Sequence, residues 1–228
     1  MIVARDLRLA LDGHVILAGV SFDVARGEAV ALVGPNGSGK TSVIRCLLGL
    51  VPFTGYAAIG GRDVVREPVA ARVQVGYVPQ RAAFGDARAA EPLAFVARLR
   101  GVDARRAVGL LDAVGLAAHA GERVRTFSGG MQQRLALAVA LVGEPPVLLL
   151  DEPSASLDAD GQRTFFDIVG RLRGRGQTLV LASHRAEEVE SLTDRVVRLD
   201  RGRVAAPPAA KPVARIVPHA ARRGGGRP

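Results

Sequence analysis

The strongest chemical pattern in the sequence is the stretch GPNGSGKT, which occupies residues 34–41. The apolar run EAVALVG leads into it, and SVIRCLLGL, with apolar residues at helical spacing, follows it. A glycine-rich turn between a buried strand and a helix directs backbone N–H groups at a phosphate, and its lysine reaches the β- and γ-phosphate oxygens. The hydroxyl after the lysine can ligate Mg²⁺. We therefore predict a triphosphate site formed by Gly34, Pro35, Asn36, Gly37, Ser38, Gly39, Lys40, Thr41 and Ser42.

Two adjacent carboxylates follow a second apolar run, PPVLLLDEP. Asp151 ends the run, where a charged group needs a reason to be, and orienting Mg²⁺ with its waters is such a reason. Glu152 points elsewhere and could polarise a water for attack on the γ-phosphorus. An acidic pair that only caps a strand-to-helix turn is the alternative, and the phosphate loop upstream favours the catalytic interpretation.

A second turn in the chain also suits an anion. In RTFSGGMQQRLA, residues 125–136, Ser128, Gly129 and Gly130 stand directly before a helical run. Glycines let backbone N–H groups approach a ligand, and a helix N-terminus carries partial positive charge. The sequence thus predicts two phosphate-binding turns in one chain, which a single nucleotide would not require.

Two further polar residues follow strand-like segments, Gln80 after RVQVGYVP and His184 after QTLVLAS. A neutral imidazole at the end of a buried strand could donate to a γ-phosphate oxygen. A histidine that simply caps a strand is the alternative, so neither residue identifies a function alone. His14, His119 and His219 are interpreted as surface or turn residues.

The elements that position these residues alternate along the chain. Residues 1–35 show strand patterns around an Asp12–Gly13 turn, and residues 81–142 are rich in Ala, Leu and Arg at helical spacing, with breaks expected at Pro92, Gly101 and Gly115. A strand, the amphipathic helix TFFDIVGRLRGRG, another strand and a hairpin around 200–202 follow. This order predicts an α/β core that carries a helical subdomain.

Composition favours a globular protein of a reducing compartment. The 228 residues are 48% hydrophobic, enough for a buried core, and no apolar run is long enough to span a bilayer. Cys46 is the only cysteine, so no internal disulfide forms. The N-terminus begins on a strand pattern and not on a signal peptide. We expect a cytoplasmic chain that meets the membrane only through a partner.

The net charge of +9 lies almost entirely at the C-terminal end. Residues 1–200 hold 24 basic and 22 acidic residues, a net charge of +2, and no acidic residue follows. The Pro-, Gly- and Arg-rich segment 206–228 is expected to be a disordered, solvated tail, contact with anionic lipid or RNA being the alternative. With 4% aromatic residues and no tryptophan, a nucleic-acid partner is not predicted.

Taken together and in order, GPNGSGKT, YVPQ, FSGGMQQR, VLLLDEP, SASLD and LASH closely resemble the ATP-binding subunits of ABC transporters. The resemblance covers residues 1–205 and leaves the tail unmatched. It implies a P-loop NTPase core with an antiparallel β subdomain and an α-helical subdomain over about 81–142. It also implies an active ATPase that uses ATP and Mg²⁺.

The resemblance explains the second turn. In this family two subunits pack head to tail, and each ATP lies between the phosphate loop of one and the signature turn of the other. Ser128, Gly129 and Gly130 would therefore hold the γ-phosphate of the partner's nucleotide. ATP would join the two subunits, as a homodimer or a heterodimer, and hydrolysis would release them.

Individual roles follow from the same resemblance. Lys40 and Thr41 would be the phosphate-loop lysine and the magnesium-binding hydroxyl, and Asp151 the second magnesium ligand. Glu152 would be the catalytic base and His184 the switch histidine.

Two loops take their roles from the resemblance as well. Gln80 would contact Mg²⁺ or water and link the site to the membrane subunit. Asp158 would belong to the loop that crosses the dimer, and residues 81–100 would form part of the groove for the permease's coupling helix.

Two departures from the family pattern stand out. Leu11 occupies the place where the family has an aromatic residue that stacks on adenine, which puts base selectivity in question. The signature also carries Phe127 for leucine and Met131 for glutamine, while the Ser-Gly-Gly that touches phosphate is intact.

The permease would be a separate chain, with a periplasmic or extracellular binding protein as a possible further partner. The middle segment resembles export-type ATPases of drug, lipid, haem and copper-maturation systems, and favours the last slightly. An importer of zinc or manganese is the alternative.

ATPases of DNA repair need a long coiled coil, yet only 47 residues separate Gln80 from Ser128. Translation-type members need two domains, and a P-loop kinase does not need the signature turn.

Overall fold

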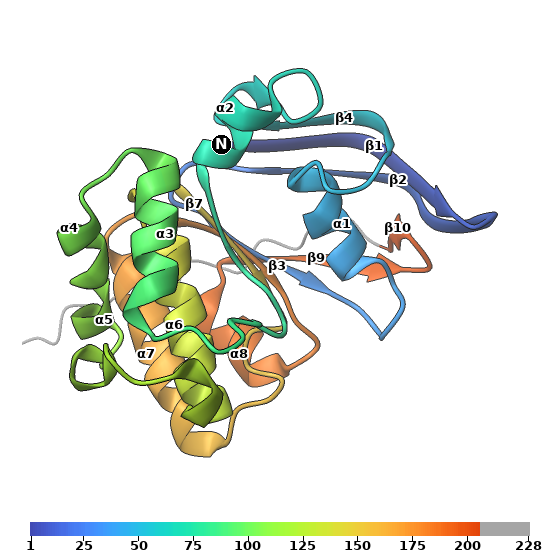
Figure 1. The fold of residues 1–228 in the computed structure, drawn as a ribbon. Helices are drawn as coiled ribbons and strands as arrows, with labels where there is room; N and C mark the ends of the chain where they lie inside the picture. The colour runs from blue at the N-terminus through green and yellow to red at the C-terminus, as the bar shows by residue number, and fades with distance from the viewer. Residues whose placement is uncertain (206–228) are drawn as a thin grey trace, which may run out of the picture.

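The computed structural model describes residues 1–205, which form two β-sheets and a set of helices around them (Figure 1). A six-stranded sheet has the order β10-β9-β3-β8-β7-β6, and a four-stranded sheet has the order β2-β1-β4-β5. The expected disordered tail, residues 206–228, lies outside the described residues.

The larger sheet forms the centre of the molecule. Its strands β3 (Ala29–Val33), β6 (Val75–Val78), β7 (Val147–Asp151), β8 (Thr178–Ala182) and β9 (Arg195–Asp200) run parallel, and only β10 (Arg203–Val204) is antiparallel. Strands buried on both faces read as continuous apolar runs, as VLLLD and TLVLA do. Because the strands are parallel, the loops after β3, β6, β7 and β8 meet at one edge of the sheet.

The two faces of this sheet pack against different partners. Leu148 and Leu150 belong to the core shared with the helices of residues 90–174, whereas Val147 and Leu149 belong to the core shared with α1 (Lys40–Leu47) and the smaller sheet. This alternation is the two-residue period of a strand. One strand of five residues therefore joins both halves of the molecule.

The smaller sheet is antiparallel throughout. Its strands are β1 (Ile2–Leu11), β2 (His14–Val24), β4 (Thr54–Ile59) and β5 (Arg62–Asp63), and the helix α2 (Pro68–Val73) follows β5. Asp12 and Gly13 have φ of +48° and +79° at the turn between β1 and β2, as a tight hairpin requires. The antiparallel subdomain expected from the sequence is present.

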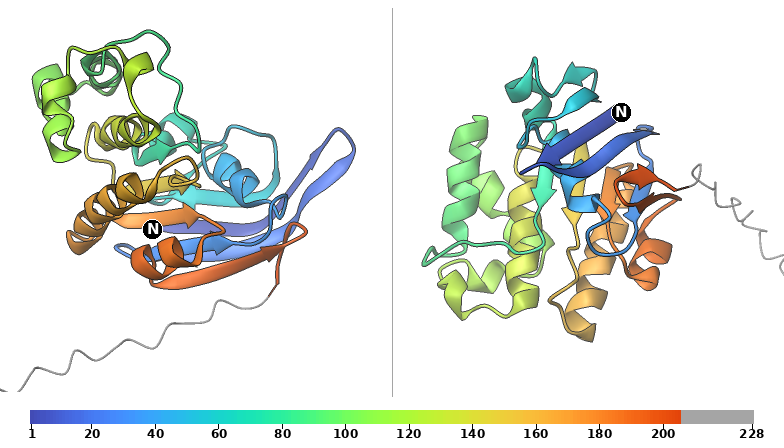
Figure 2. Two further views of the ribbon diagram at one scale, coloured as in Figure 1. Left: turned by 90° about the horizontal axis from the view of Figure 1, so that it is seen from below. Right: turned by 90° about the vertical axis from the view of Figure 1, so that its right-hand side faces the viewer.

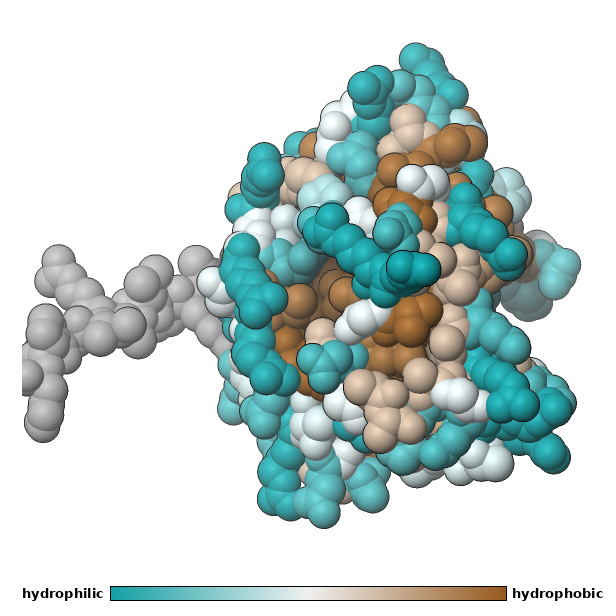
Figure 3. All heavy atoms as spheres, turned by 60° about the vertical axis from the view of Figure 1, so that its left-hand side comes forward, coloured by the Kyte–Doolittle hydropathy of each residue, from teal (hydrophilic) through white to brown (hydrophobic). Residues whose placement is uncertain are grey.

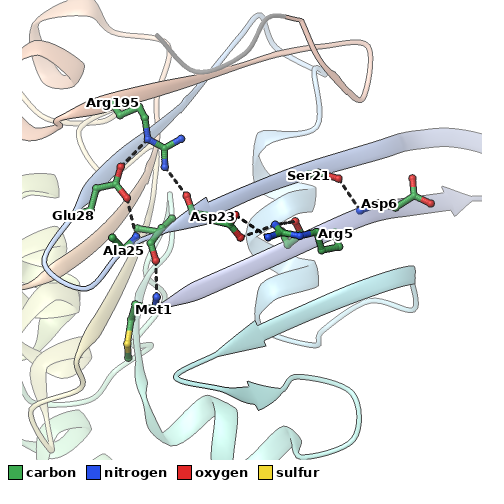
Figure 4. A network of polar contacts seen from close by, with 10 residues as sticks. Met1, Arg5, Asp6, Ser21, Asp23, Ala25, Glu28 and Arg195 are labelled. Carbon is green, nitrogen blue, oxygen red and sulfur yellow. Dashed lines mark hydrogen bonds and ion pairs between the residues drawn. The ribbon is translucent and has the colours of Figure 1, made fainter. Parts of the chain in front are cut away.

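A polar network joins the two sheets (Figure 4). Arg195 of β9 donates from Nε to Glu28 Oε1 at 2.7 Å and from Nη2 to the carbonyl oxygen of Asp23 in β2. The N-terminal ammonium of Met1 donates to the carbonyl of Val24 at 2.7 Å. Burial alone would raise the pKa of Glu28, but the hydrogen bonds from Arg195 and the Ala25 N–H hold that pKa below its ordinary value. The network fixes the hairpin relative to the core.

The remaining helices gather on the other face of the central sheet. They are α3 (Ala90–Arg100), α4 (Ala104–Val108), α5 (Leu110–Ala113), α6 (Gly129–Leu141), α7 (Ala159–Gly174) and α8 (Ala186–Leu192), with short 3₁₀ turns at Ala117–His119 and Val124–Thr126. In both views of Figure 2 the green helices α3–α5 lie apart from the blue strands β1 and β2. Where the boundaries of a helical subdomain fall remains a prediction.

The break expected at Pro92 is wrong. Pro92 is the third residue of α3, and the helix continues to Arg100. The N–H groups of a first turn have no partner within the helix, so a proline there removes nothing. Gly101 and Gly115 do end helical segments, each with a positive φ, of +66° and +68° respectively.

A cavity of about 320 Å³ lies between α4, α5 and the end of α6. On the side turned forward in Figure 3, apolar surface gathers in a hollow surrounded by hydrophilic side chains. Within residues 1–205, no helix combines the length and the apolar character needed to cross a membrane.

Candidate nucleotide site

The phosphate loop connects β3 to α1, and two of its glycines are required by close contacts. A Cβ at Gly34 would lie 2.2 Å from the carbonyl oxygen of Leu199 and 2.6 Å from Ser38 Oγ. Gly39 has φ of +105°, and a Cβ there would lie 2.7 Å from the Leu17 side chain. The backbone can follow this path only without side chains at these positions.

Lys40 is held inside this loop. It is 4% exposed, and its Nζ donates to the carbonyl oxygens of Gly34 at 2.9 Å and Pro35 at 3.2 Å. The same atom lies 3.5 Å from Glu152 Oε1. A buried ammonium needs anions or acceptors around it, and the phosphates of a nucleotide would be stronger acceptors than these carbonyls.

Thr41 and Asp151 meet across the site. The Thr41 hydroxyl donates to Asp151 Oδ1 at 2.9 Å, and Asp151 is 2% exposed. Burial raises the pKa of Asp151, while the Thr41 hydrogen bond lowers it. Tyr77 lies beside the same carboxylate, and burial together with the Asp151 charge raises the pKa of Tyr77 to about 12.

A hydroxyl and a carboxylate are oxygen ligands of the kind that Mg²⁺ takes in nucleotide sites. Within the described part of the chain, no group of three or more His, Cys, Asp or Glu side chains could hold a metal by itself. Mg²⁺ usually keeps several waters and shares one or two protein ligands with substrate phosphates, and Thr41 and Asp151 are two oxygen ligands of that kind. The residues present therefore suit a magnesium ion that arrives with a nucleotide.

Glu152 is the point where the remaining predicted residues converge. Gln80 Nε2 donates to its Oε2 at 3.2 Å, and His184 Nδ1 lies 3.5 Å from its Oε1. Its backbone has φ of +44°, a left-handed conformation that is rare for glutamate. The N–H of Glu152 donates to the carbonyl of Ala182 at 2.8 Å, which holds this conformation in place.

An open pocket of about 470 Å³ lies over the phosphate loop, while His184 lines a second cavity together with Gly34 and Pro35. The lining of the first pocket combines the phosphate loop with Gln80, Glu152 and Ile16 of β2. Leu11, at the end of β1, is 38% exposed and is not among the lining residues. The sequence did not indicate that Ile16 or Tyr77 belongs to the site. Ile16 reaches the pocket because the two sheets meet there, and Tyr77 reaches Asp151 because β6 pairs with β7.

The signature turn lies elsewhere. Ser128 is the N-cap of α6, its Oγ accepts the N–H of Met131 at 3.2 Å, and Gly129 begins the helix. Phe127 is buried behind the turn, where the ring of His119 meets it edge-on with centroids 6.0 Å apart. No residue of this turn is among those that line the nucleotide pocket.

The helix behind the turn does touch the nucleotide side of the molecule. Gln133 of α6 is 2% exposed and donates from Nε2 to the carbonyl of Pro79 at 2.9 Å. Pro79 precedes Gln80, so α6 supports the loop that carries this glutamine. Asp158 is the N-cap of α7, its Oδ1 accepting the N–H of Gly161 at 2.8 Å.

The fold and the site together define an ATP-binding domain of the P-loop NTPase class. The family model described as ABC transporter matches residues 17–155. Over 212 residues the chain is 35% identical to the linearmycin resistance ATP-binding protein LnrL of Bacillus subtilis, covering 90% of this chain and 68% of that protein. It is 41% identical to the daunorubicin resistance ATP-binding protein DrrA3 of Streptomyces coeruleorubidus, covering 83% and 62%.

A Nod factor export ATP-binding protein I from Ralstonia nicotianae is 36% identical, covering 87% of this chain and 64% of that protein. The chain thus spans 62 to 68% of the length of these three relatives. A solved structure titled as the ATP binding subunit of an ABC transporter superposes with a TM-score of 0.83 at 29% identity, covering 92% of this chain and 90% of the other. The chain belongs to the ABC transporter family.

This membership confirms the predicted family and fold, and it implies that the chain binds ATP and is an ATPase. The roles of individual site residues stay predictions, although the structure brings Lys40, Gln80, Glu152 and His184 together.

Proposed function

We propose that this chain binds ATP with Mg²⁺ and hydrolyses it at the interface of two ATP-binding subunits, and that this drives an export-type transporter. The observation that carries the proposal is the set of contacts around Glu152. One carboxylate faces Lys40, Gln80 and His184, while Thr41 and Asp151 stand paired beside it.

Each side chain has a task in this scheme. Lys40 would leave the carbonyls of Gly34 and Pro35 and bind the β- and γ-phosphate oxygens. Thr41 and Asp151 would hold Mg²⁺, which neutralises charge on those oxygens when bound.

Glu152 would then accept a proton from a water as its oxygen attacks the γ-phosphorus and the bond to the bridging oxygen breaks. Gln80 and His184, both in contact with Glu152, would orient the water and the γ-phosphate. The electron pair of the broken bond stays on ADP.

A second subunit would complete the site. Ser128, Gly129 and the first turn of α6 offer a hydroxyl and a helix N-terminus, and none of these residues lines the pocket over the phosphate loop. Another copy, or a related ATP-binding subunit, would bring a nucleotide to them.

Export and membrane partners are proposed from the relatives. The relatives named above are proteins of drug resistance and of Nod factor export, so we propose an exporter with a separate transmembrane permease. The chain would then lie at the inner face of the cell membrane. These names give no support to a copper-linked system, to a zinc or manganese importer, or to an external binding protein.

The test uses the purified full chain with Mg²⁺ and ATP. Glu152→Gln should retain nucleotide binding, lose about 10³-fold in kcat and accumulate as an ATP-bound dimer in size-exclusion runs. Glu187→Gln, which changes an exposed carboxylate of α8, is the matched control and should behave as wild type. A monomeric and fully active Glu152→Gln protein would refute the proposal.

A further inference from the structure

Glu188 is a buried carboxylate that the scheme above does not use. It lies in α8, is 1% exposed, and its Oε2 accepts the Ser183 hydroxyl at 2.5 Å. Ser183 Oγ in turn accepts the backbone N–H of Arg185 at 3.0 Å. Both residues that flank His184 are therefore tied to this one carboxylate, directly or through a single hydroxyl.

The same carboxylate faces the segment that follows Glu152. The Ser154 hydroxyl is fully buried and lowers the pKa of Glu188, which burial raises. Glu188 Oε1 and Ser154 Oγ are both without a hydrogen-bond partner of good geometry among the described residues. A buried polar atom costs free energy unless it is paired, and pairing these two would satisfy both.

A second bridge joins the same two segments nearer the surface. Arg185 Nη2 donates to Gln162 Oε1 at 2.9 Å, and Gln162 Nε2 donates to the carbonyl of Leu157 at 2.8 Å. Leu157 directly precedes Asp158. Residues 183–185 are thus hydrogen-bonded to Leu157 by way of Gln162, and Ser154 lies beside Glu188 deeper in the protein.

Packing alone does not require a carboxylate at this position. The neighbouring Val189 and the nearby Leu192 fill the same side of α8 with apolar side chains. Glutamate at the third position of a helix can accept the N–H of the N-cap residue, which is Arg185 in α8. Here Ser183 Oγ accepts that N–H instead, and the Ser183 hydroxyl donates to Glu188. The arrangement caps α8 and also places a fixed acceptor between two loops of the nucleotide site.

We propose that Glu188 is a positioning residue for ATP hydrolysis, which holds the loop of His184 in register with the 154–158 segment through Ser183 and Ser154. The inference rests on the proposed function, in which His184 helps to orient the γ-phosphate, and on the family resemblance, which would put Asp158 in the loop that crosses the dimer. Movement of one loop on dimer closure would then carry the other with it.

The test compares three variants of the full chain. Glu188→Ala removes the acceptor, Glu188→Gln keeps an acceptor of the same shape, and Glu187→Ala is the exposed control next to it. Glu188→Ala should lower kcat about tenfold with less than about a threefold change in KM, because the phosphate loop is untouched. Glu188→Gln should recover most of kcat, and Glu187→Ala should match wild type. Equal kcat for Glu188→Ala and Glu187→Ala would overturn the inference.

A double-mutant cycle separates positioning from simple stability. In a His184→Ala background, measured by single turnover with excess enzyme, Glu188→Ala should cause no further loss, because its effect passes through His184. A purely structural role would instead add its full loss in both backgrounds and contradict the inference.

If Glu188→Ala does not fold, Gln162→Ala serves in its place, since this half-buried side chain belongs to the outer bridge. It should lower kcat about threefold, and the loss should again disappear with His184→Ala. A loss that persists there would overturn the inference. Failure of the proposed function gives a different result, because the wild-type chain itself would then neither hydrolyse ATP nor dimerise with it.

Discussion

The phosphate loop and the signature turn are built from the same parts and end in opposite situations. Each has glycines at a helix N-terminus. The phosphate loop is enclosed by its own chain, with Lys40 4% exposed and in contact with Glu152. The signature turn is exposed at Ser128 and Gly129, and its hydroxyl caps its own helix.

The difference teaches that anion-binding geometry and catalytic chemistry are separable. Carboxylates, glutamine and histidine converge only where the ends of parallel strands meet, and that is beside the phosphate loop. The signature turn, at the start of α6, contributes none of the residues that line the phosphate-loop pocket and carries no carboxylate or histidine, so it can offer binding but no proton transfer. In the proposed scheme a complete site needs both turns, and two chains supply them.

The largest expected effect separates the two turns directly. Lys40→Ala should abolish detectable ATP binding by the isolated chain and lower hydrolysis at least about 10³-fold, because the buried cation that would meet the phosphates is lost. Ser128→Ala should leave ATP binding by the monomer unchanged and lower hydrolysis alone. Equilibrium binding of a fluorescent ATP analogue, run beside a phosphate-release assay, checks both. Loss of monomer binding in Ser128→Ala would erase the distinction between the two turns.

A smaller effect is expected at the polar network of Arg195, Glu28 and Asp23, which joins the two sheets. It thereby helps to position β2, whose Ile16 lines the nucleotide pocket. Arg195→Met should lower the free energy of unfolding at pH 7 by about 2 kcal/mol, since Glu28 loses a charged donor. Arg198→Met, on the exposed face of the same strand, is the control and should change little.

The sign of the pH dependence follows from the lowered pKa of Glu28. Its stabilisation is present above the ordinary glutamate pKa of about 4.3 and is lost as pH falls through the lower pKa of the folded state. Urea unfolding at several pH values should therefore show the Arg195→Met deficit shrinking in acid. A deficit that is constant with pH would exclude the ion pair as its cause.

The smallest expected effect concerns binding of the adenine ring of ATP. Leu11→Tyr should tighten ATP binding about threefold, because an aromatic ring at the end of β1 could stack on adenine where an aliphatic side chain gives less contact. His14→Tyr, across the hairpin turn, is the control. Titrations with ATP and GTP measure the change, and a Leu11→Tyr protein with unaltered affinity for both would show that β1 does not reach the base.

The sequence was sufficient to predict which polar residues lie together beside the phosphate loop, because of one topological rule. Asp151, Glu152, Gln80 and His184 each follow an apolar run, and parallel strands bring such ends together. It was also sufficient for Gly101, whose left-handed conformation ends α3.

Other features depend on contacts that no local pattern records. Ile16 reaches the pocket only because the second sheet folds over α1, and Tyr77 meets Asp151 only through the pairing of β6 with β7. Glu188 resembles any acidic residue in the first turn of a helix until Ser183 and Ser154 are seen around it. Pro92 shows the reverse error, in which a local rule was applied without knowing where the helix begins.

One experiment tests the central claim most directly, that each site combines the phosphate loop of one chain with the signature turn of another. Lys40→Ala and Ser128→Arg chains, each expected to be inactive alone, are mixed in equal amounts with Mg²⁺ and ATP. If the chains pair at random, about half of the dimers contain one chain of each kind, and in such a dimer one of the two sites has neither substitution. The mixture should therefore recover about a quarter of the wild-type rate per chain. A mixture that stays inactive, beside a wild-type rate per chain that does not depend on protein concentration, would contradict the account.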